Sequence, residues 1–184
     1  EITITKSGSV IPFILNVDKP ASAPDLPDPQ IFGEWSFNST GVEAVLTNAS
    51  ENTAVIFKQV LHFFETLKID LLKEASLRKL FHKIGKTTYG DAIHSILNMI
   101  EMEFKQCLGE NGKKVFSSIE NKKNAMPPEL FLGGLNCFGI GFGVRKAKAL
   151  LNHFGSIENL RSITVDKIIE VDGFDVITAT NVFN

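Results

Sequence analysis

The spacing of hydrophobic positions changes from alternation to a helical period near residue 53. Residues 2–5 (Ile-Thr-Ile-Thr) alternate, which predicts a half-buried strand, and residues 10–15 predict a second, apolar strand after a turn at 6–9. Pro12 cannot donate to a ladder, so it belongs at a sheet edge or a strand start. Because two strands alone are marginally stable, we expect them to end a larger β domain whose earlier strands lie outside this sequence.

A polar, proline-rich stretch at 18–28 predicts a linker. Two short apolar pieces follow, at 31–37 and 42–46. The sequence Asn-Ser-Thr-Gly at 38–41 between them predicts a turn. We therefore expect a small β-hairpin in this region.

From residue 53 onward, apolar side chains recur at the spacing of helices. Asn52 or Thr53 is the candidate N-cap of the first helix, whose inward stripe comprises Val55, Ile56, Val60, Phe63, Phe64 and Leu67. Further helices are predicted at 71–81, at 91–104 (one helix or a pair), at 112–122, and from Glu129 after a Pro-Pro pair. Facing inward in the second helix we expect Leu72, Leu77, Leu80 and Phe81.

Gly141-Phe142-Gly143 is the most informative segment of the helical part. The two glycines permit a left-handed backbone and the close approach of another group, and a helix follows at once. Its first turns carry three cations, Arg145, Lys146 and Lys148. Free N–H groups at a helix start, the positive end of the helix dipole and nearby cations together favour a phosphate. Such a contact does not read base sequence. The alternative is a helix pair whose turn simply requires small residues.

The same design recurs at Gly173-Phe174-Asp175, and each copy carries a small Ala four residues after its third residue. Between the copies, Gly155 is expected to end a helix and Ser156 to cap the next. Asp175 stands where the first copy has Gly143 and places a negative charge beside the proposed phosphate seat. We therefore expect the second hairpin to bind phosphate more weakly or to be purely structural.

Charge and composition limit these hypotheses. The chain has 184 residues, 43% of them hydrophobic, and a net charge of −2, so any nucleic-acid binding must come from local basic clusters. These clusters are Lys113-Lys114, Lys122-Lys123, Arg145-Lys146-Lys148, and Lys83 with Lys86. Each of them is also typical of a solvated helix face.

Cys107 and Cys137 cannot form a zinc site by themselves. We expect two free, buried thiols in a reducing compartment, with a disulfide as the alternative. The four histidines are scattered, and no paired carboxylates or hydrolase triad are evident. No long apolar run or signal peptide is present, which predicts a cytoplasmic protein without a membrane partner. The chain does not begin with Met, so it is expected to lie inside a longer polypeptide.

Four blocks, in order, resemble the C-terminal half of bacterial-type, NAD-dependent DNA ligases. Residues 4–12 are similar to the OB-fold strand pattern of that family, and residues 60–74 to the entry into its helix-hairpin-helix domain. Residues 112–123 resemble a helix of that domain. The segment AKALLNHFGS at 147–156 is very close to the family's hairpin helix, and Glu170 to Gly173 matches its next turn. The resemblance covers essentially the whole chain.

The resemblance implies a mainly α fold. Residues 1–19 would be partial OB-fold strands, 20–52 a linker and a degenerate zinc-finger-like hairpin, and 53–184 a tandem helix-hairpin-helix domain. The chain would clamp nicked double-stranded DNA, and the implied DNA-binding residues are Gly141, Gly143, Val144, Arg145, Lys146, Lys148, Gly173, Lys113, Lys114, Lys122 and Lys123. Lys6 and Ser7 are further candidates from the OB-fold. The alternatives are a stand-alone helix-hairpin-helix module of a repair or recombination protein and a helical protein-interaction adaptor.

The chain also departs from the family pattern. The family's zinc finger has four cysteines, whereas residues 25–52 contain neither Cys nor His, so we expect no zinc. Leu71 and Lys73 replace the glycines of the first hairpin, which is therefore expected to be structural. The Lys-x-Asp-Gly motif that would accept AMP is absent, so NAD and Mg²⁺ are expected on a catalytic part elsewhere. We expect a subunit or fragment of a divergent, viral or phage ligase, partnered by that adenylating part.

Overall fold

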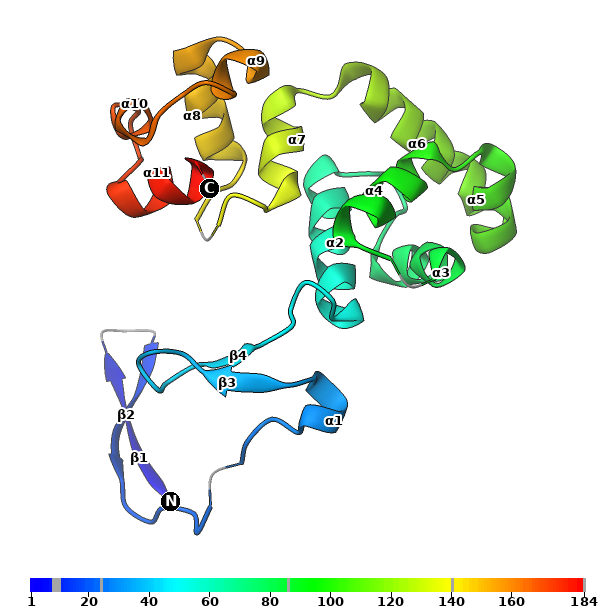
Figure 1. Cartoon of the computed structure of the whole chain (residues 1–184). Helices are drawn as coiled ribbons and strands as arrows, with labels where there is room; N and C mark the ends of the chain where they lie inside the picture. The colour runs from blue at the N-terminus through cyan, green and yellow to red at the C-terminus, as the bar shows by residue number, and fades with distance from the viewer. Residues whose placement is uncertain (8–10, 24, 86, 140, 184) are drawn as a thin grey trace. The chain divides into compact units, whose positions relative to one another are not determined.

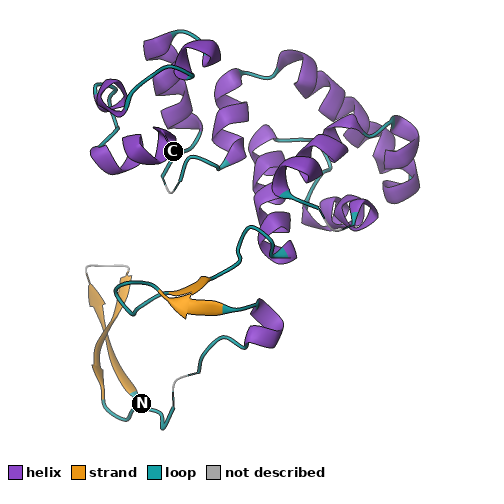
Figure 2. Cartoon of the chain, viewed as in Figure 1, coloured by secondary structure: helices purple, strands orange, loops and turns teal. Residues whose placement is uncertain are grey.

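A computed structural model describes residues 1–7, 11–23, 25–85, 87–139 and 141–183. The chain divides into two compact units, residues 1–48 and 49–184. Strands occur in the first unit and the second is helical (Figure 2), which confirms a mainly α fold with a small β segment. The elements (Figure 1) are β1 (Ile2–Ser7), β2 (Ile11–Val17), α1 (Pro29–Phe32), β3 (Trp35–Phe37), β4 (Ala44–Leu46), α2 (Thr53–Leu67), α3 (Glu74–Ile84), α4 (Tyr89–Asn98), α5 (Glu101–Leu108), α6 (Asn111–Ala125), α7 (Pro128–Leu135), α8 (Val144–Phe154), α9 (Ile157–Leu160), α10 (Val165–Ile169) and α11 (Val176–Phe183).

In the first unit, β1 and β2 form an antiparallel ladder, as the alternation predicts. The register runs from Ile2 opposite Val17 to Ser7 opposite Ile11, with an irregularity after Thr3. Part of the predicted turn and the side chains of residues 6 and 7 lie outside the described residues. The ladder leaves large apolar side chains about half exposed or more, namely Ile2, Ile4, Ile14, Leu15 and Val17.

The predicted hairpin forms from β3 and β4, which pair antiparallel. The Asn38 side chain holds the turn, because its Oδ1 accepts from Thr40 Oγ1 at 2.8 Å and from the backbone of residues 42 and 43. The prediction of strand from residue 31 is wrong. Residues 29–32 form a helical turn, since Pro29 starts it and the Asp28 carboxylate accepts from the N–H of Gln30 at 2.9 Å.

The first core of the helical unit surrounds α2. Asn52 caps this helix, as predicted, with its side chain accepting from Ala54 N at 3.0 Å and Val55 N at 3.2 Å. The predicted stripe of α2 is buried except for Val55, which is half-buried. The side chains expected to face inward from the next segment are buried as well: Leu72, Leu77, Leu80 and Phe81.

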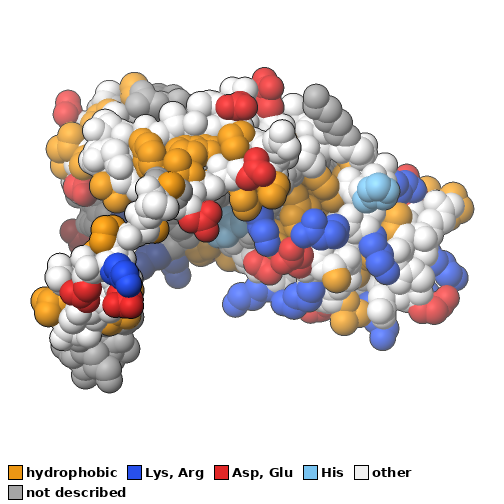
Figure 3. Space-filling view, turned by 90° about the horizontal axis from the view of Figure 1, so that it is seen from below, with side chains coloured by type: hydrophobic (Ala, Val, Ile, Leu, Met, Phe, Trp, Pro, Cys, Tyr) orange, Lys and Arg blue, Asp and Glu red, His pale blue; other side chains and the backbone are white. Residues whose placement is uncertain are grey.

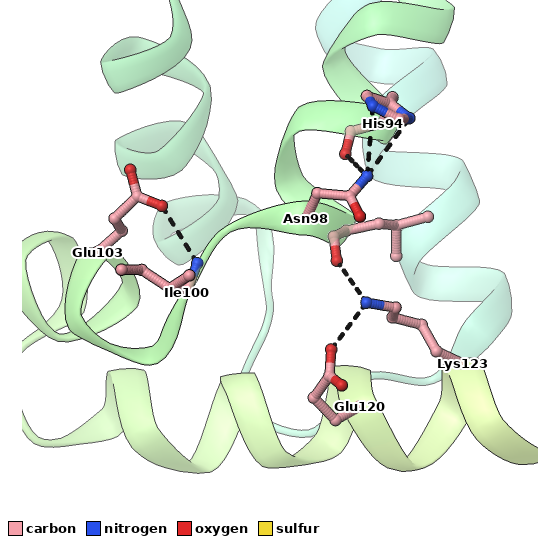
Figure 4. Close-up of polar contacts among 7 residues, drawn as sticks. His94, Asn98, Ile100, Glu103, Glu120 and Lys123 are labelled. Atoms are coloured by element: carbon pink, nitrogen blue, oxygen red, sulfur yellow. Dashed lines mark hydrogen bonds and ion pairs between the residues drawn. The ribbon is translucent and has the colours of Figure 1, made fainter.

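Two predicted helix boundaries change in the structure. The helix expected from residue 71 begins at Glu74, because Leu71 adopts a left-handed φ of +61° and Lys73 is extended. The segment 91–104 contains two helices, α4 and α5. Figure 4 shows the break between them, where the Glu103 carboxylate accepts from the Ile100 N–H at 3.1 Å and so caps α5.

Helix α7 lies between the two cores of the helical unit. The first core includes α2 and receives Leu130 and Leu135 from α7, whereas Leu132 belongs to the second core with α8, α10 and α11. Two adjacent glycines allow the close packing. A Cβ on Gly133 would lie 2.6 Å from Val144 Cα, and a Cβ on Gly134 would lie 3.2 Å from the Phe63 ring.

We predict that Gly133→Ala lowers the free energy of unfolding by about 2–3 kcal/mol, because the added methyl group collides with the backbone of α8. The control is Gly90→Ala in the first turn of α4, where nothing lies within 4 Å of the new Cβ. The control should leave stability unchanged or raise it by up to about 1 kcal/mol. Urea unfolding of both variants measures the difference. Equal stabilities would contradict the packing described at Gly133.

Candidate nucleic-acid interface

Three turns in the helical unit share one backbone design, at residues 69–73, 139–143 and 171–175. Each is closed by an N–H from its fourth residue to the carbonyl of its first, with N···O distances of 3.4, 3.4 and 3.1 Å. The third residue of each is left-handed, with φ of +61° at Leu71, +83° at Gly141 and +89° at Gly173. The fourth residue is buried in each case: Leu72, Phe142 and Phe174. A left-handed third residue is the signature of a type II turn, which glycine adopts most easily.

Leu71 therefore adopts the same turn as the two glycines, although it carries a side chain. The Asp70 N–H of this turn donates to Ser118 Oγ of α6 at 3.0 Å, which fixes the turn to the core. The Leu71 side chain itself is 46% exposed. The first hairpin thus keeps its backbone geometry and differs from the other two in what covers it.

The three helices that follow these turns differ in whether a side chain accepts a hydrogen bond from their first N–H groups. In α11 the Asp175 Oδ1 accepts from Thr178 N at 2.8 Å and from Thr178 Oγ1 at 2.7 Å. These bonds to Thr178 hold the pKa of the Asp175 carboxyl below its ordinary value. In α8 the capping residue is Gly143, which has no side chain to occupy the N–H groups. Lys73 likewise makes no side-chain cap on α3.

The cations of α8 do not all behave alike. Arg145 and Lys148 are exposed, whereas Lys146 is half-buried and its Nζ lies 5.2 Å from the centre of the Phe174 ring. Lys146 also contributes to the low pKa of Asp175. Lys146 therefore helps to join the two glycine hairpins. Arg145 and Lys148 are exposed to solvent in the first turns of α8.

The turns at 139–143 and 171–175 lie side by side. Their central rings, Phe142 and Phe174, are 6.3 Å apart between centroids, and Phe138 packs on Phe142 at 4.7 Å. Gly139 lies against Asn181 of α11, since a Cβ there would be 2.9 Å from the Asn181 Nδ2. Figure 1 shows α11 beside the turn that joins α7 and α8. The predicted residues Gly141 to Lys148 and Gly173 thus form one surface.

The predicted lysines of α6 are separate from this surface, because α7 lies between α6 and α8 (Figure 1). Lys113 and Lys114 are exposed and Lys122 is half-buried. Lys123 is exposed, but its Nζ is engaged, 3.0 Å from the Leu97 carbonyl and 2.8 Å from Glu120 Oε1 (Figure 4). On the face that Figure 3 presents, basic and acidic side chains are interspersed. Of the other predicted basic residues, Lys86 lies outside the described residues.

The cysteines, the metal-binding residue types and the helices indicate no other kind of site among the described residues. Both cysteines are free, but Cys137 is exposed, so the prediction that both are buried is wrong; it lies just after the end of α7. Across the described ranges, no group of three or more His, Cys, Asp or Glu is placed to hold a metal ion. Within the same residues, no helix combines the length and apolarity needed to cross a membrane.

Reasoning from the sequence missed Val176 and Ile177, which are 63% and 73% exposed at the start of α11. Their positions correspond to Val144 and Arg145 of α8. Aligning the two glycine hairpins residue by residue would have shown an apolar side chain where the first copy has a cation.

The chain is similar in sequence to DNA ligases of several organisms. A DNA ligase of Acanthamoeba polyphaga mimivirus is 29% identical over 185 residues, covering 96% of the chain. A putative DNA ligase of Invertebrate iridescent virus 6 is 28% identical and covers 98% of it. The chain matches part of a DNA ligase. It spans 28% and 27% of the lengths of these two ligases.

A shorter part of the chain is similar to a protein that is not a ligase. The UvrABC system protein C of Mycolicibacterium paratuberculosis is 52% identical over 42 residues, which is 23% of the chain. No family model matches the sequence. The similarity to these two DNA ligases extends along nearly the whole chain.

We predict that Asp175→Ala lowers the thermal unfolding midpoint at neutral pH and has a diminishing effect in acid. The carboxyl has a lower pKa in the folded chain than its ordinary 3.8. Its stabilising contribution is therefore complete above pH 3.8 and is lost as the pH falls through the folded pKa. Thermal melts of both proteins across this range measure the effect, with Thr178→Val as a second route to the same loss. A midpoint difference that does not shrink in acid would contradict the assignment.

Proposed function

We propose that this chain is the DNA-gripping part of an NAD-dependent DNA ligase. A catalytic part outside this sequence would take AMP from NAD with the help of Mg²⁺, pass it to the 5′-phosphate of a nick, and seal the nick. The present chain would hold the nicked duplex by its backbone. The length of the similarity to DNA ligases supports this role.

The observation that carries the proposal is the open start of α8. Its first N–H groups have no capping side chain at Gly143, and nothing lies within 4 Å of a Cβ built there. Arg145 and Lys148 are exposed beside it. A backbone phosphate can approach these N–H groups, where the helix dipole and the two cations stabilise it.

The three turns would belong to helix-hairpin-helix units that contribute unequally to DNA binding. The hairpin at Gly141 would carry most of the phosphate contact. The one at Gly173 would carry less, because the negatively charged Asp175 carboxylate already accepts from the Thr178 N–H. Lys113, Lys114 and Lys122 would extend the contact along the duplex. Lys123 would contribute little, since it is already engaged by Leu97 and Glu120.

The β1–β2 ladder fits the same proposal. Its exposed apolar side chains are those of a sheet that further strands would cover. We propose that it belongs to an OB-fold completed by strands outside this sequence, and that the β3–β4 hairpin replaces a zinc finger through its hydrogen-bonded turn. In place of a metal, the Asn38 side chain would hold the hairpin through its bonds to Thr40 and to the backbone of residues 42 and 43.

A second candidate is a stand-alone helix-hairpin-helix module of a repair protein. The similarity to UvrABC system protein C favours this candidate, because it is confined to about a quarter of the chain and does not involve a ligase. The two candidates differ in their partner. Recovery of the native protein with, or as part of, a polypeptide that carries a covalent AMP on lysine, detected by mass spectrometry, supports the ligase. An intact native protein without one supports the repair module.

We predict that Arg145→Ala weakens binding to a nicked duplex and reduces the slope of log affinity against log salt by about 0.9, the share of one phosphate. Gly143→Ala should weaken binding too, because its methyl group stands where the phosphate approaches. Fluorescence anisotropy over a salt series measures both. Gly90→Ala is the matched control, a glycine in a first helical turn with equally open surroundings. Wild-type affinity in both variants at low salt would refute the phosphate seat.

A further inference from the structure

The Lys146 side chain of α8 lies where the two glycine turns meet. Its Nζ is 5.2 Å from the centre of the Phe174 ring in the second turn. The same Nζ is 4.0 Å from the position that a Cβ on Gly141 would take, so it also lies beside the first turn. Lys146 is half-buried, whereas the neighbouring cations Arg145 and Lys148 are exposed. Lys146 is therefore engaged between the two hairpins, unlike its two neighbours.

The Phe174 ring is contacted by two groups from the first hairpin. The Phe142 ring lies 6.3 Å away between centroids, and the Lys146 ammonium lies over the Phe174 ring. An ammonium group is attracted to the electron-rich face of an aromatic ring, and the attraction grows as water is removed. The Asp175 carboxylate attracts the same ammonium, which contributes to the low pKa of that carboxyl. Both attractions therefore favour the pairing of the two hairpins.

The equivalent residue of the second hairpin is used differently. Lys146 is the third residue of α8, and Thr178 is the third residue of α11. Thr178 bonds within its own helix start, since its N–H and its Oγ1 donate to Asp175 Oδ1 at 2.8 and 2.7 Å. At the start of α8, Gly143 has no side chain for such a bond. The third helical residue therefore closes the helix start in one hairpin, whereas in the other it reaches across and leaves the helix start open.

We propose that Lys146 is a positioning residue, which holds the Phe174 hairpin against the Gly141 turn and does not itself bind a phosphate. The inference rests on the proposed function, because the phosphate seat at Gly143 is what this pairing keeps in place. Binding costs less free energy when a site is already ordered in the free protein. Removal of the Lys146 charge should therefore weaken DNA binding without removing a phosphate contact.

Salt dependence separates the two roles, because a phosphate contact releases counterions and a contact within the protein does not. Lys146→Met keeps the length of the side chain without its charge. It should weaken binding of the full chain to a nicked duplex about threefold, the effect of one partly exposed cation–ring contact, with an unchanged slope of log affinity against log salt. Lys146→Arg should restore the affinity, since a guanidinium group also stacks on an aromatic ring.

The matched comparison is Lys148→Met, at an exposed lysine of the same helix. It should reduce the salt slope by about 0.9, the share of one phosphate. Fluorescence anisotropy over a salt series measures affinity and slope. An equal reduction of the slope in Lys146→Met would identify Lys146 as a phosphate ligand and overturn the inference. Wild-type affinity in Lys146→Met, while Arg145→Ala weakens binding, would overturn it too.

Thermal unfolding without DNA tests the pairing independently of the proposed function, and the anisotropy comparison does not require Phe174→Leu to fold. Lys146→Met should lower the unfolding midpoint, and its effect should be smaller in a Phe174→Leu background, where the ring is gone. An equal effect in both backgrounds would overturn the inference. Unchanged DNA binding in Arg145→Ala, together with the expected coupling, would instead remove the proposed function and leave the contact of Lys146 with the second hairpin.

Discussion

The helical unit depends on the close approach of backbones at α7. Gly133 lies against the start of α8 and Gly134 lies against the Phe63 ring of α2, so one short helix joins two hydrophobic cores. Neither contact leaves room for a side chain of ordinary size. The position of α8, and therefore of the open N–H groups at Gly143, is set by this packing. The Tyr89 hydroxyl adds a further tie, since it donates to the carbonyl of Leu135 at 2.6 Å, and burial raises its pKa to about 12.

The turns show which part of a hairpin depends on glycine. Leu71 adopts the same left-handed backbone as Gly141, although a residue with a Cβ pays about 1 kcal/mol for that conformation. The burial of Leu72 and the bond from Asp70 to Ser118 hold this turn in shape. Packing of the fourth residue thus maintains the fold of the turn. The absence of a side chain matters instead for whether a phosphate can approach the N–H groups of the following helix. This distinguishes Gly143, at the start of α8, from Lys73, at the start of α3.

Sequence patterns were sufficient for the elements that depend on local interactions. The Asn52 cap, the α2 stripe and the Ser156 cap of α9 follow from residue type and spacing alone, and the structure has all three. The helical turn at 29–32 and the late start of α3 were missed because Asp28 and Leu71 act through geometry that apolar periodicity does not record. The engagement of Lys123 by Leu97, 26 residues away, requires the tertiary fold and no local pattern could reveal it.

The same limit applies to the charges of the candidate interface. The sequence places three cations in α8. In the folded chain, however, Lys146 lies over the ring of Phe174 and interacts electrostatically with Asp175. If Lys146 were drawn toward a phosphate, Asp175 would lose part of the attraction that lowers its pKa, so the second hairpin would resist that movement. Among the described contacts, neither Arg145 nor Lys148 forms an ion pair or a ring contact, so both can bind an anion without breaking one. The pairing of hairpins that builds the surface therefore also decides which of its cations can act.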